Sequence, residues 1–308
     1  MGNPIKIRMG GYGPPSTGFS KSLKLIGDKL EAQFGNDVAV EYVFNIMDHG
    51  HKAEHILTLV EDGLMTLGYQ SSSYLTDRVP ELGFVDLPFL FSTNGQARAA
   101  MDGELGRFLV RKTEERINYR ILGWFENGFR HISNRLRPIH VPADMKGMKI
   151  RVLPSEIHKR TFELLGAIAM RMDLTEAIAM IKAGTLDAQE NPLANTVTYG
   201  VHKFHKFHTL TNHFYISRPI FLHRPSFESW PESVQRAMQT AVAEAVSFQR
   251  ELAIEEHEQS RKAIEAEGCK INALTPGEHD AFVAAVQPLL NDSRKTYGDA
   301  TFKMVPKP

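Results

Sequence analysis

Two arginines stand inside apolar segments that read as buried β-strands, and they are the residues best suited to bind an anion. Arg130 lies in Gly128-Phe129-Arg130-His131-Ile132, and Arg151 comes near the end of the segment 148–152. Removing a guanidinium from water costs several kcal/mol unless its charge is paired. Each arginine should therefore either pair with a buried acid or hold a carboxylate ligand, which the guanidinium fork binds in a bidentate manner. Two such arginines in a chain without an enzyme motif favour anion binding.

Motifs that would indicate catalysis or nucleotide binding are missing from the sequence. The run Gly10-Gly11-Tyr12-Gly13 follows a predicted strand, but two prolines come next and the spacing is not that of a dinucleotide-binding loop. Neither a phosphate-binding loop nor a nucleophile elbow occurs. Cys269 is the single cysteine, which excludes an internal disulfide and a cysteine zinc site. We therefore expect no cofactor and no catalytic residue.

The chain contains 13 histidines, and two groups of them raise the question of a metal site. The groups are His49, His51 and His55, which follow Asp48, and His202, His205 and His208, which recur every third residue beside two lysines. Neither group has a His-Glu-x-x-His motif or a cysteine partner. We predict solvated histidines and no metal, and the first group leaves a zinc or nickel carrier as an alternative.

Composition limits the class of protein. Lys and Arg together number 36, as do Asp and Glu, so the formal net charge is zero and we expect no nucleic-acid partner. No run approaches the ~18 consecutive apolar residues of a membrane span. The start shows no charged segment followed by an apolar run, so either the protein is cytoplasmic or a leader is missing from this sequence.

The first part of the chain predicts an alternation of strands and helices. Apolar spacing and glycine positions indicate strands at 5–9, 38–44 and 64–69, and helices at 19–34 and 53–60. This order implies parallel strands covered by helices, because parallel strands need a crossover. Ligands of such sheets bind at the carboxyl ends of the strands, where the loops gather.

The remaining elements suggest two lobes joined by one long helix. Further helices are predicted at 96–115, 155–165 and 175–182, and strands at 121–125, 129–133, 148–152, 186–189, 210–215 and 219–223. Residues 232–267 contain no Gly or Pro and keep a helical register, which gives a helix of ~54 Å. A helix of that length is longer than one domain is wide. A chain of 308 residues is also about twice the usual domain length.

Several segments together resemble the solute-binding proteins of tripartite ATP-independent periplasmic (TRAP) transporters. They are Asp86-Leu87-Pro88-Phe89-Leu90-Phe91, Gly128-x-Arg130, the segment 142–152 with Gly147, Lys149 and Arg151, Met172, and the segment 184–192 that ends in Gln189-Glu190-Asn191-Pro192. The resemblance runs from the first strand to the long helix, which is nearly the whole chain. The stretch 69–73 stands where the family varies with its ligand.

The resemblance implies an α/β fold of the two-lobed periplasmic binding protein class, a clamshell with hinge strands and one long lobe-bridging helix. We place lobe I at 1–127 plus about 213–250, and lobe II at 128–212 plus about 251–308. The family implies a periplasmic location with the signal peptide removed. It also implies a small organic acid as ligand and integral-membrane TRAP permease subunits as partners, and we expect a monomer.

The resemblance also assigns residues to the ligand. Arg151 is expected to form the salt bridge to the ligand carboxylate, assisted by Arg130 and Asn191, and Met172 belongs to the same motif. Residues at loop positions are expected to complete the site. Apolar contacts with the ligand would come from Tyr12, Tyr69, Phe89 and Tyr215. Gln70 or His213 would hydrogen-bond a hydroxyl or keto oxygen of the ligand. The alternative from another class is an enzyme, such as a lyase that acts on a carboxylate in the same cleft.

Overall fold

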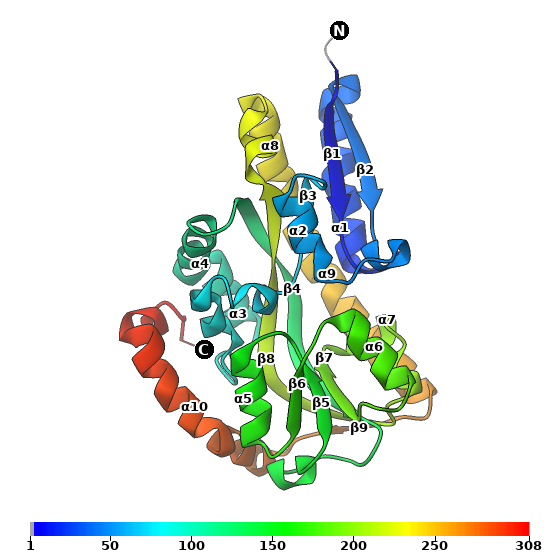
Figure 1. The fold of residues 1–308 in the computed structure, drawn as a ribbon, viewed down its shortest axis with the longest axis vertical. Helices are drawn as coiled ribbons and strands as arrows, with labels where there is room; N and C mark the ends of the chain where they lie inside the picture. Colours follow the sequence, from blue (N-terminus) through cyan, green and yellow to red (C-terminus); the bar gives the residue numbers. More distant parts are fainter. Residues whose placement is uncertain (1–2, 308) are drawn as a thin grey trace. The chain divides into compact units, whose positions relative to one another are not determined.

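The computed structural model describes residues 3–307 of the chain (Figure 1). Nine strands and ten α-helices make up this part. The strands are β1 (Ile5–Gly10), β2 (Val38–Val43), β3 (Leu67–Tyr69), β4 (Tyr119–Asn134), β5 (Lys149–Val152), β6 (Ile168–Arg171), β7 (Ala188–Asn191), β8 (Phe207–His223) and β9 (Lys270–Ala273). The helices are α1 (Gly18–Phe34), α2 (His55–Glu61), α3 (Asn94–Asp102), α4 (Glu104–Glu114), α5 (Glu156–Leu164), α6 (Leu174–Lys182), α7 (Leu193–Thr198), α8 (Arg224–Ser229), α9 (Glu232–Ala266) and α10 (Pro276–Lys303).

The chain divides into two compact units. Unit 1 consists of Met1–Ser71, Phe108–Glu126 and Ser217–Ile254, and unit 2 consists of Ser72–Arg107, Asn127–Ile216 and Glu255–Pro308. Four of the boundaries fall inside α4, β4, β8 and α9, so each of these elements belongs partly to both units. The sequence-based division placed residues 72–107 in the first lobe, whereas contacts within the structure group them with unit 2.

In unit 1, strands β1, β2 and β3 form the parallel arrangement that the alternating pattern predicts. β1 pairs in parallel with β2 and with β3, and β3 pairs antiparallel with β8. Because β1 and β3 are parallel neighbours, the loops that follow them begin at the same edge of the sheet. Tyr12 and Tyr69 therefore meet, with ring centroids 5.4 Å apart.

The sequence prediction was wrong about β4 and β8, each of which it divided into two strands. Both are continuous, with 16 and 17 residues. Polar or glycine residues interrupt the apolar pattern of each strand, at Asn127-Gly128 in β4 and at Ser217-Arg218 in β8. In β4, Gly128 takes a left-handed φ of 84° while the strand continues through it. The sheet order is β2-β1-β3-β8-β4-β7-β5-β6, with β9 paired to β8.

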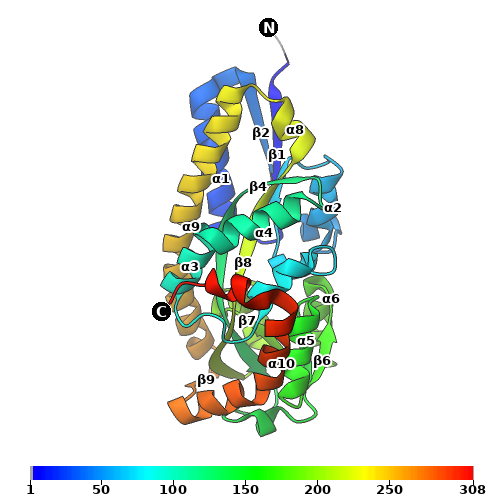
Figure 2. The ribbon, with the colours of Figure 1, turned by 90° about the vertical axis from the view of Figure 1, so that its left-hand side faces the viewer.

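The long helix predicted at 232–267 is present as α9, which has 35 residues and spans about 52 Å. Its apolar face packs inside unit 1, where Val234, Met238, Val242 and Ala245 are buried. Figure 2 shows this part of α9 beside α1, and Lys29 of α1 forms an ion pair with Glu244 of α9. None of the helices in residues 3–307 is long and apolar enough to cross a membrane.

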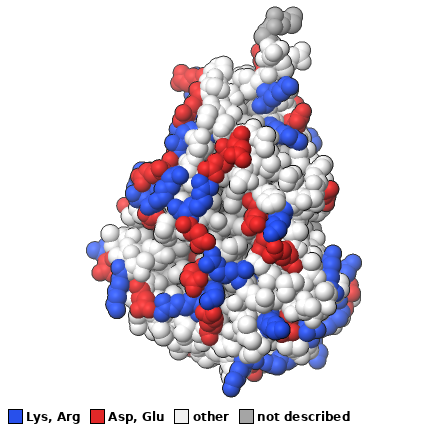
Figure 3. All heavy atoms as spheres, viewed as in Figure 1, with Lys and Arg blue, Asp and Glu red and all other residues white. Residues whose placement is uncertain are grey.

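Unit 2 is built around a second apolar core. Ile150 and Val152 of β5 and Phe162 of α5 are buried in it together with Phe282 and Val286 of α10. Helix α10 lies beyond the elements that sequence periodicity predicted, and a capping box of Thr275 and Glu278 starts it. On the face of the molecule in Figure 3, basic and acidic side chains are interspersed, in keeping with the zero net charge.

Candidate functional site

Arg151 lies on β5, which pairs with β6 on one side and with β7 on the other. This position between two strands leaves the side chain only 1% exposed. Its Nε donates to the carbonyl oxygen of Met172 (3.1 Å), and its Nη2 donates to the hydroxyl of Tyr74 (3.1 Å). Within residues 3–307, no carboxylate lies at ion-pair distance from Arg151 and Nη1 has no hydrogen-bond partner. The guanidinium is thus buried against neutral acceptors only.

Tyr74 holds this arginine in place, and sequence reasoning missed it. The Tyr74 hydroxyl also accepts from the backbone N–H of Leu174 (3.2 Å) and donates to Asp173 Oδ2 (3.4 Å). Asp173 in turn caps α6 by accepting from the N–H of Thr175 (2.8 Å). The start of α6 therefore fixes Tyr74, which fixes the guanidinium plane of Arg151. Tyr74 is 77 residues from Arg151 in the sequence, so no local pattern could have indicated the contact.

Arg130 has the structural partner that Arg151 lacks. Its Nε donates to Glu190 Oε2, and its Nη2 donates to Glu190 Oε1 (2.9 Å) and to the Glu190 carbonyl oxygen (2.6 Å). Burial works to raise the pKa of the Glu190 carboxyl, but the Arg130 guanidinium overcomes it and holds the pKa well below its usual range. Among the described residues, Arg130 Nη1 has no hydrogen-bond partner. The role of Arg130 toward a ligand stays a prediction.

His213 and Asn191 also lie in buried polar surroundings of unit 2. His213 Nδ1 is 2.6 Å from Thr211 Oγ1, and its Nε2 is 3.5 Å from Glu190 Oε2. Burial lowers the pKa of His213, so the ring is neutral at pH 7. The Asn191 amide donates to Gln189 Oε1 (3.0 Å) and accepts from Asn195 Nδ2 (3.3 Å). Both predicted site residues thus have protein partners, and their contacts with a ligand stay predictions.

The other predicted site residues of unit 2 supply backbone groups and rings. Met172 gives its carbonyl oxygen to Arg151, and its side chain packs against a cluster that includes Ala177 and Ile181. Phe89 is half-buried with a left-handed φ of 55°, and its N–H donates to the carbonyl oxygen of His213 (2.8 Å). Tyr215 is buried with its ring against those of two phenylalanines, Phe91 and Phe129.

Asn127, which the sequence analysis did not select, is buried with neither amide atom hydrogen-bonded.

In unit 1, the predicted residues Tyr12, Tyr69 and Gln70 lie at the carboxyl ends of β1 and β3. Tyr69 stacks on Phe19 with ring centroids 5.1 Å apart. The Gln70 amide donates to the carbonyl oxygen of Ala53 (2.9 Å) and accepts from the N–H of Ser71 (2.9 Å). The Gln70 amide therefore stabilises the loop, and its predicted hydrogen bond to a ligand oxygen stays a prediction.

Arg218 is the functional candidate of unit 1 that sequence reasoning missed. Its guanidinium carbon lies 4.1 Å from the ring centroid of Phe19, 5.0 Å from that of Tyr12 and 5.7 Å from that of Tyr69. The residue is 3% exposed, and its Nε is buried without a hydrogen-bond partner. The sequence prediction left Arg218 outside the strands at 210–215 and 219–223, so it was not recognised as an arginine within a strand.

The prediction of a solvated face for His202, His205 and His208 was wrong, because all three are buried. His205 Nδ1 is 2.9 Å from Ser133 Oγ, and His208 Nε2 is 3.1 Å from the carbonyl oxygen of His205. Burial lowers the pKa of His205 to about 3 and that of His208 to about 4. In the described part of the chain, no group of three His, Cys, Asp or Glu residues could hold a metal ion.

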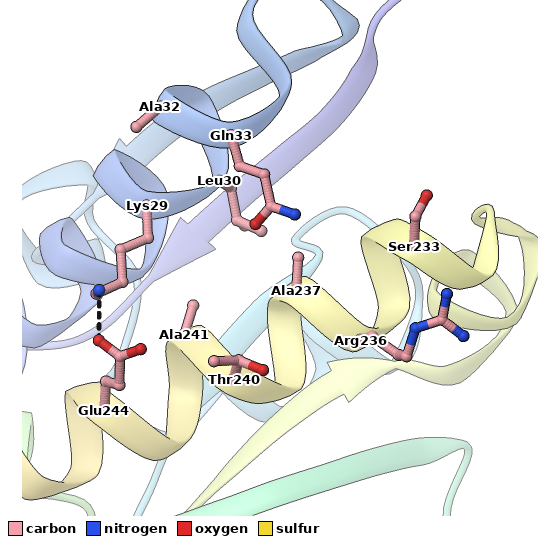
Figure 4. Close-up of a pocket in the computed structure, with 10 residues that line it drawn as sticks. All are labelled: Lys29, Leu30, Ala32, Gln33, Ser233, Arg236, Ala237, Thr240, Ala241 and Glu244. Atoms are coloured by element: carbon pink, nitrogen blue, oxygen red, sulfur yellow. Dashed lines mark ion pairs between the residues drawn. The ribbon is translucent and has the colours of Figure 1, made fainter.

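A surface pocket of about 580 Å³ lies between α1 and α9 of unit 1 (Figure 4). Ten residues line it, among them Lys29 and Glu244, whose ion pair closes one end. None of the predicted ligand-binding residues lines this pocket. Its lining is mostly polar side chains and small alanines, so the pocket is a groove between helices and has no buried charge to recognise an acid.

The chain matches a known family over nearly its full length. The family is that of the bacterial extracellular solute-binding proteins, family 7 (DctP), whose sequence profile matches residues 10–296. The chain therefore belongs to this family. A solute-binding protein of Verminephrobacter eiseniae is 29% identical over 246 residues, which cover 80% of this chain and 72% of that protein.

Solved structures show the same fold. The sugar acid binding protein of Advenella mimigardefordensis, in complex with galactonate, superposes with a TM-score of 0.92 at 25% identity, over 98% of this chain and 97% of that one. A TRAP periplasmic solute-binding protein of Sulfurospirillum deleyianum with bound succinate gives a TM-score of 0.91 at 25% identity, over 99% of both chains. The predicted resemblance to TRAP solute-binding proteins is confirmed. The predicted fold class, a two-lobed α/β binding protein with shared strands and one long helix, is confirmed as well.

Proposed function

We propose that this protein captures a small organic acid in the periplasm by means of Arg151 and delivers it unchanged to the membrane subunits of a TRAP permease. The observation that carries the proposal is the state of the Arg151 guanidinium, which is 1% exposed and bonded only to a carbonyl oxygen and a phenol. Buried charges in proteins are paired. In the described residues Arg151 has no acid beside it, so the counter-charge is supplied by a ligand.

The hydrogen bonds already made by Arg151 define which part of the guanidinium serves the ligand. Nε is used by Met172 and one edge of Nη2 by Tyr74, so Nη1 and the second N–H of Nη2 remain. Two adjacent nitrogens of a planar fork fit the two oxygens of one carboxylate. The solved relatives that hold galactonate and succinate both carry an acid, which supports a carboxylate ligand. A monomer is sufficient for this function.

Binding without chemistry is favoured over catalysis. The two groups bonded to Arg151 are a backbone carbonyl and a phenol hydroxyl, and neither is a general base at neutral pH. Incubation of the protein with any acid that it binds should leave that acid unchanged by mass spectrometry. Appearance of a product would replace the transport function with the enzyme alternative.

The test combines thermal-shift screening with calorimetry on variants of Arg151. A panel of mono- and dicarboxylates, sugar acids and 2-oxo acids should contain a ligand, and at 100 times its Kd that ligand should stabilise the fold by about 2.7 kcal/mol. Arg151→Ala and Arg151→Lys should both lose affinity for it, since an ammonium cannot reproduce the planar fork.

Arg171 on the neighbouring strand β6 is the matched control. It pairs with Asp77 and Glu156 near the surface of the same unit, and Arg171→Lys should keep the affinity. No response to any acid, or an Arg151→Ala variant that binds as tightly as the wild type, would remove the proposed site.

A further inference from the structure

Arg218 of unit 1 is a buried guanidinium without a counter-charge. Within residues 3–307, none of its nitrogens has a hydrogen-bond acceptor and no carboxylate lies at ion-pair distance. The rings of Tyr12, Phe19 and Tyr69 attract the cation through their faces but accept none of its N–H groups. Because buried charges in proteins are paired, the N–H groups of Arg218 are suited to an anion that the chain itself does not supply.

The guanidinium of Arg218 lies at the start of helix α1. Its carbon is 4.1 Å from the ring centroid of Phe19, which is the second residue of α1. Side chains of a helix lean toward its N-terminus, so the Phe19 ring and the guanidinium stacked on it lie at that end. The Thr17 hydroxyl accepts from the N–H of Ser20, whereas in the described chain the N–H of Phe19 has no acceptor. A free N–H and the positive end of the helix dipole thus lie close to Arg218.

The hydroxyl of Ser71 is a third group without a partner in the same unit. Strand β3 pairs antiparallel with β8, and Tyr69 faces Ile220. Continued by two residues, this register sets Ser71 opposite Arg218, and opposite residues of an antiparallel pair project on the same face. Ser71 Oγ is buried without a hydrogen-bond partner. The hydroxyl can therefore donate to an anion that Arg218 holds.

The connection between β1 and α1 is of a kind that binds anions. Helix α1 follows β1 through the glycine-rich loop at residues 10–13 and lies alongside β1 and β2 (Figure 1). The N-terminus of a helix that follows a strand and a glycine-rich loop recurs in proteins as an oxyanion site. The glycine spacing of this loop is not that of a dinucleotide-binding loop, which favours a free inorganic anion over a nucleotide.

We propose that unit 1 holds a small inorganic oxyanion, of the phosphate or sulfate class, between Arg218, the N-terminus of α1 and the Ser71 hydroxyl. All three groups belong to unit 1, so the site is complete without Arg151 and is independent of the proposed function. Donors that come from three separate elements fit the oxygens of a tetrahedral anion, which point in different directions. The bound anion neutralises Arg218, so it should also stabilise the folded protein.

The test titrates inorganic phosphate into the protein in a buffer free of phosphate and sulfate, with potassium chloride at the same ionic strength as the reference. Calorimetry should detect binding of phosphate, and the melting temperature should rise above that in chloride. Arg218→Gln should reduce the affinity for phosphate by ~10–100-fold and abolish the rise in melting temperature. Arg151→Ala should keep both, since Arg151 lies in unit 2.

The matched control is Arg120→Gln, which removes one positive charge from the same unit. Arg120 is paired with Glu114 and Glu228 near the surface, so its loss should leave phosphate binding intact. If Arg218→Gln fails to fold, Arg218→Lys and Ser71→Ala take its place. Arg218→Lys keeps the charge but loses the fork, and Ser71→Ala loses one neutral donor, so each should bind phosphate several-fold more weakly than the wild type.

A wild type that responds to phosphate and sulfate no more than to chloride would overturn the inference. So would phosphate binding that survives Arg218→Gln, or that survives both Arg218→Lys and Ser71→Ala unchanged. Phosphate binding that is lost in Arg151→Ala and kept in Arg218→Gln would assign the anion to Arg151 and remove the site in unit 1. None of these results touches the proposed function, which is tested by the affinity of Arg151 variants for organic acids.

Discussion

The hydroxyl of Tyr74 accepts a hydrogen bond from Arg151 Nη2 at 3.1 Å, and this contact fixes the most important cation of unit 2. The same hydroxyl is bonded to the N–H of Leu174 and to Asp173, so it has no freedom to turn away. Arg151 is thus held by the protein without being neutralised. A pre-oriented cation binds its ligand without a further entropic cost for ordering its own side chain.

Tyr74→Phe should therefore weaken binding of the acid more than it weakens the fold. Loss of the hydroxyl removes an acceptor from Arg151 and should lower affinity by about tenfold, while stability falls by about 1–2 kcal/mol. Tyr119→Phe is the matched control, since the Tyr119 hydroxyl donates to the carbonyl oxygen of Leu57 within unit 1. It should lose similar stability and keep full affinity by calorimetry. Equal affinity losses in the two variants would contradict a positioning role for Tyr74.

Arg130 and Arg151 should respond in opposite ways to truncation. Arg130→Ala strands the Glu190 carboxylate, which is fully buried, and should cost about 3–5 kcal/mol of stability. Arg151→Ala strands no acid and should cost less stability than Arg130→Ala, but it should reduce ligand binding by about 2–5 kcal/mol. Urea unfolding and ligand titration on both variants measure the contrast. A strongly destabilised Arg151→Ala that still binds tightly would reverse the assignment of the two arginines.

Sequence periodicity predicted the elements that carry Arg151 and the long helix, because their apolar residues keep one uninterrupted period. It failed where polar residues interrupt the period. Asn127 and Arg218 are polar residues within continuous strands, and their presence led to the division of β4 and β8 into shorter strands. Arg218 follows Ser217 in a polar interruption of the apolar pattern, and it would have been noticed as an arginine inside a strand only if β8 had been read as one strand.

The partners of each arginine could not be read from the sequence. Sequence reasoning left open whether each arginine pairs with a buried acid or with a ligand. The answer differs between the two, with Glu190 beside Arg130 and only Tyr74 and a carbonyl oxygen beside Arg151. These contacts join residues 60 and 77 positions apart. Only tertiary packing sets them.

Because of its buried histidines, the protein should have a lower free energy of unfolding as the pH is lowered through the mildly acidic range. Burial lowers the pKa of His205 to about 3 and of His208 to about 4, whereas both are near 6.5 in the unfolded chain. Below pH 6.5 these histidines therefore bind protons in the unfolded state and remain unprotonated in the native state. The free energy of unfolding should fall by up to about 1.4 kcal/mol per pH unit for each such histidine, until the pH nears its native pKa.

Urea unfolding at pH 7, 6, 5 and 4.5 measures this slope. His208→Gln keeps a nitrogen that can donate to the carbonyl oxygen of His205 and should make the slope shallower. The exposed His49→Gln, which removes a histidine that the fold does not bury, is the control. Identical slopes for His208→Gln and the wild type would show that His208 is not protonated differently in the two states.

Gly11→Ala should disturb the aromatic group around Arg218, because Tyr69 packs directly on the backbone of this glycine. A Cβ at residue 11 would lie 2.6 Å from the Tyr69 hydroxyl oxygen and 2.8 Å from two of its ring carbons. The ring has little room to withdraw, since it stacks on Phe19 and lies against Arg218. The substitution should cost about 1–3 kcal/mol of stability, the usual penalty for overpacking.

Gly13→Ala in the same loop provides the comparison for that prediction. Its Cβ would meet Thr17 Cγ2 at 3.4 Å, an ordinary contact, so stability should change by less than about 0.5 kcal/mol. Thermal unfolding of the two variants measures the difference in stability. A Gly11→Ala protein as stable as Gly13→Ala would show that the Tyr69 ring is free to move, and that its contact with Arg218 does not hold the guanidinium in place.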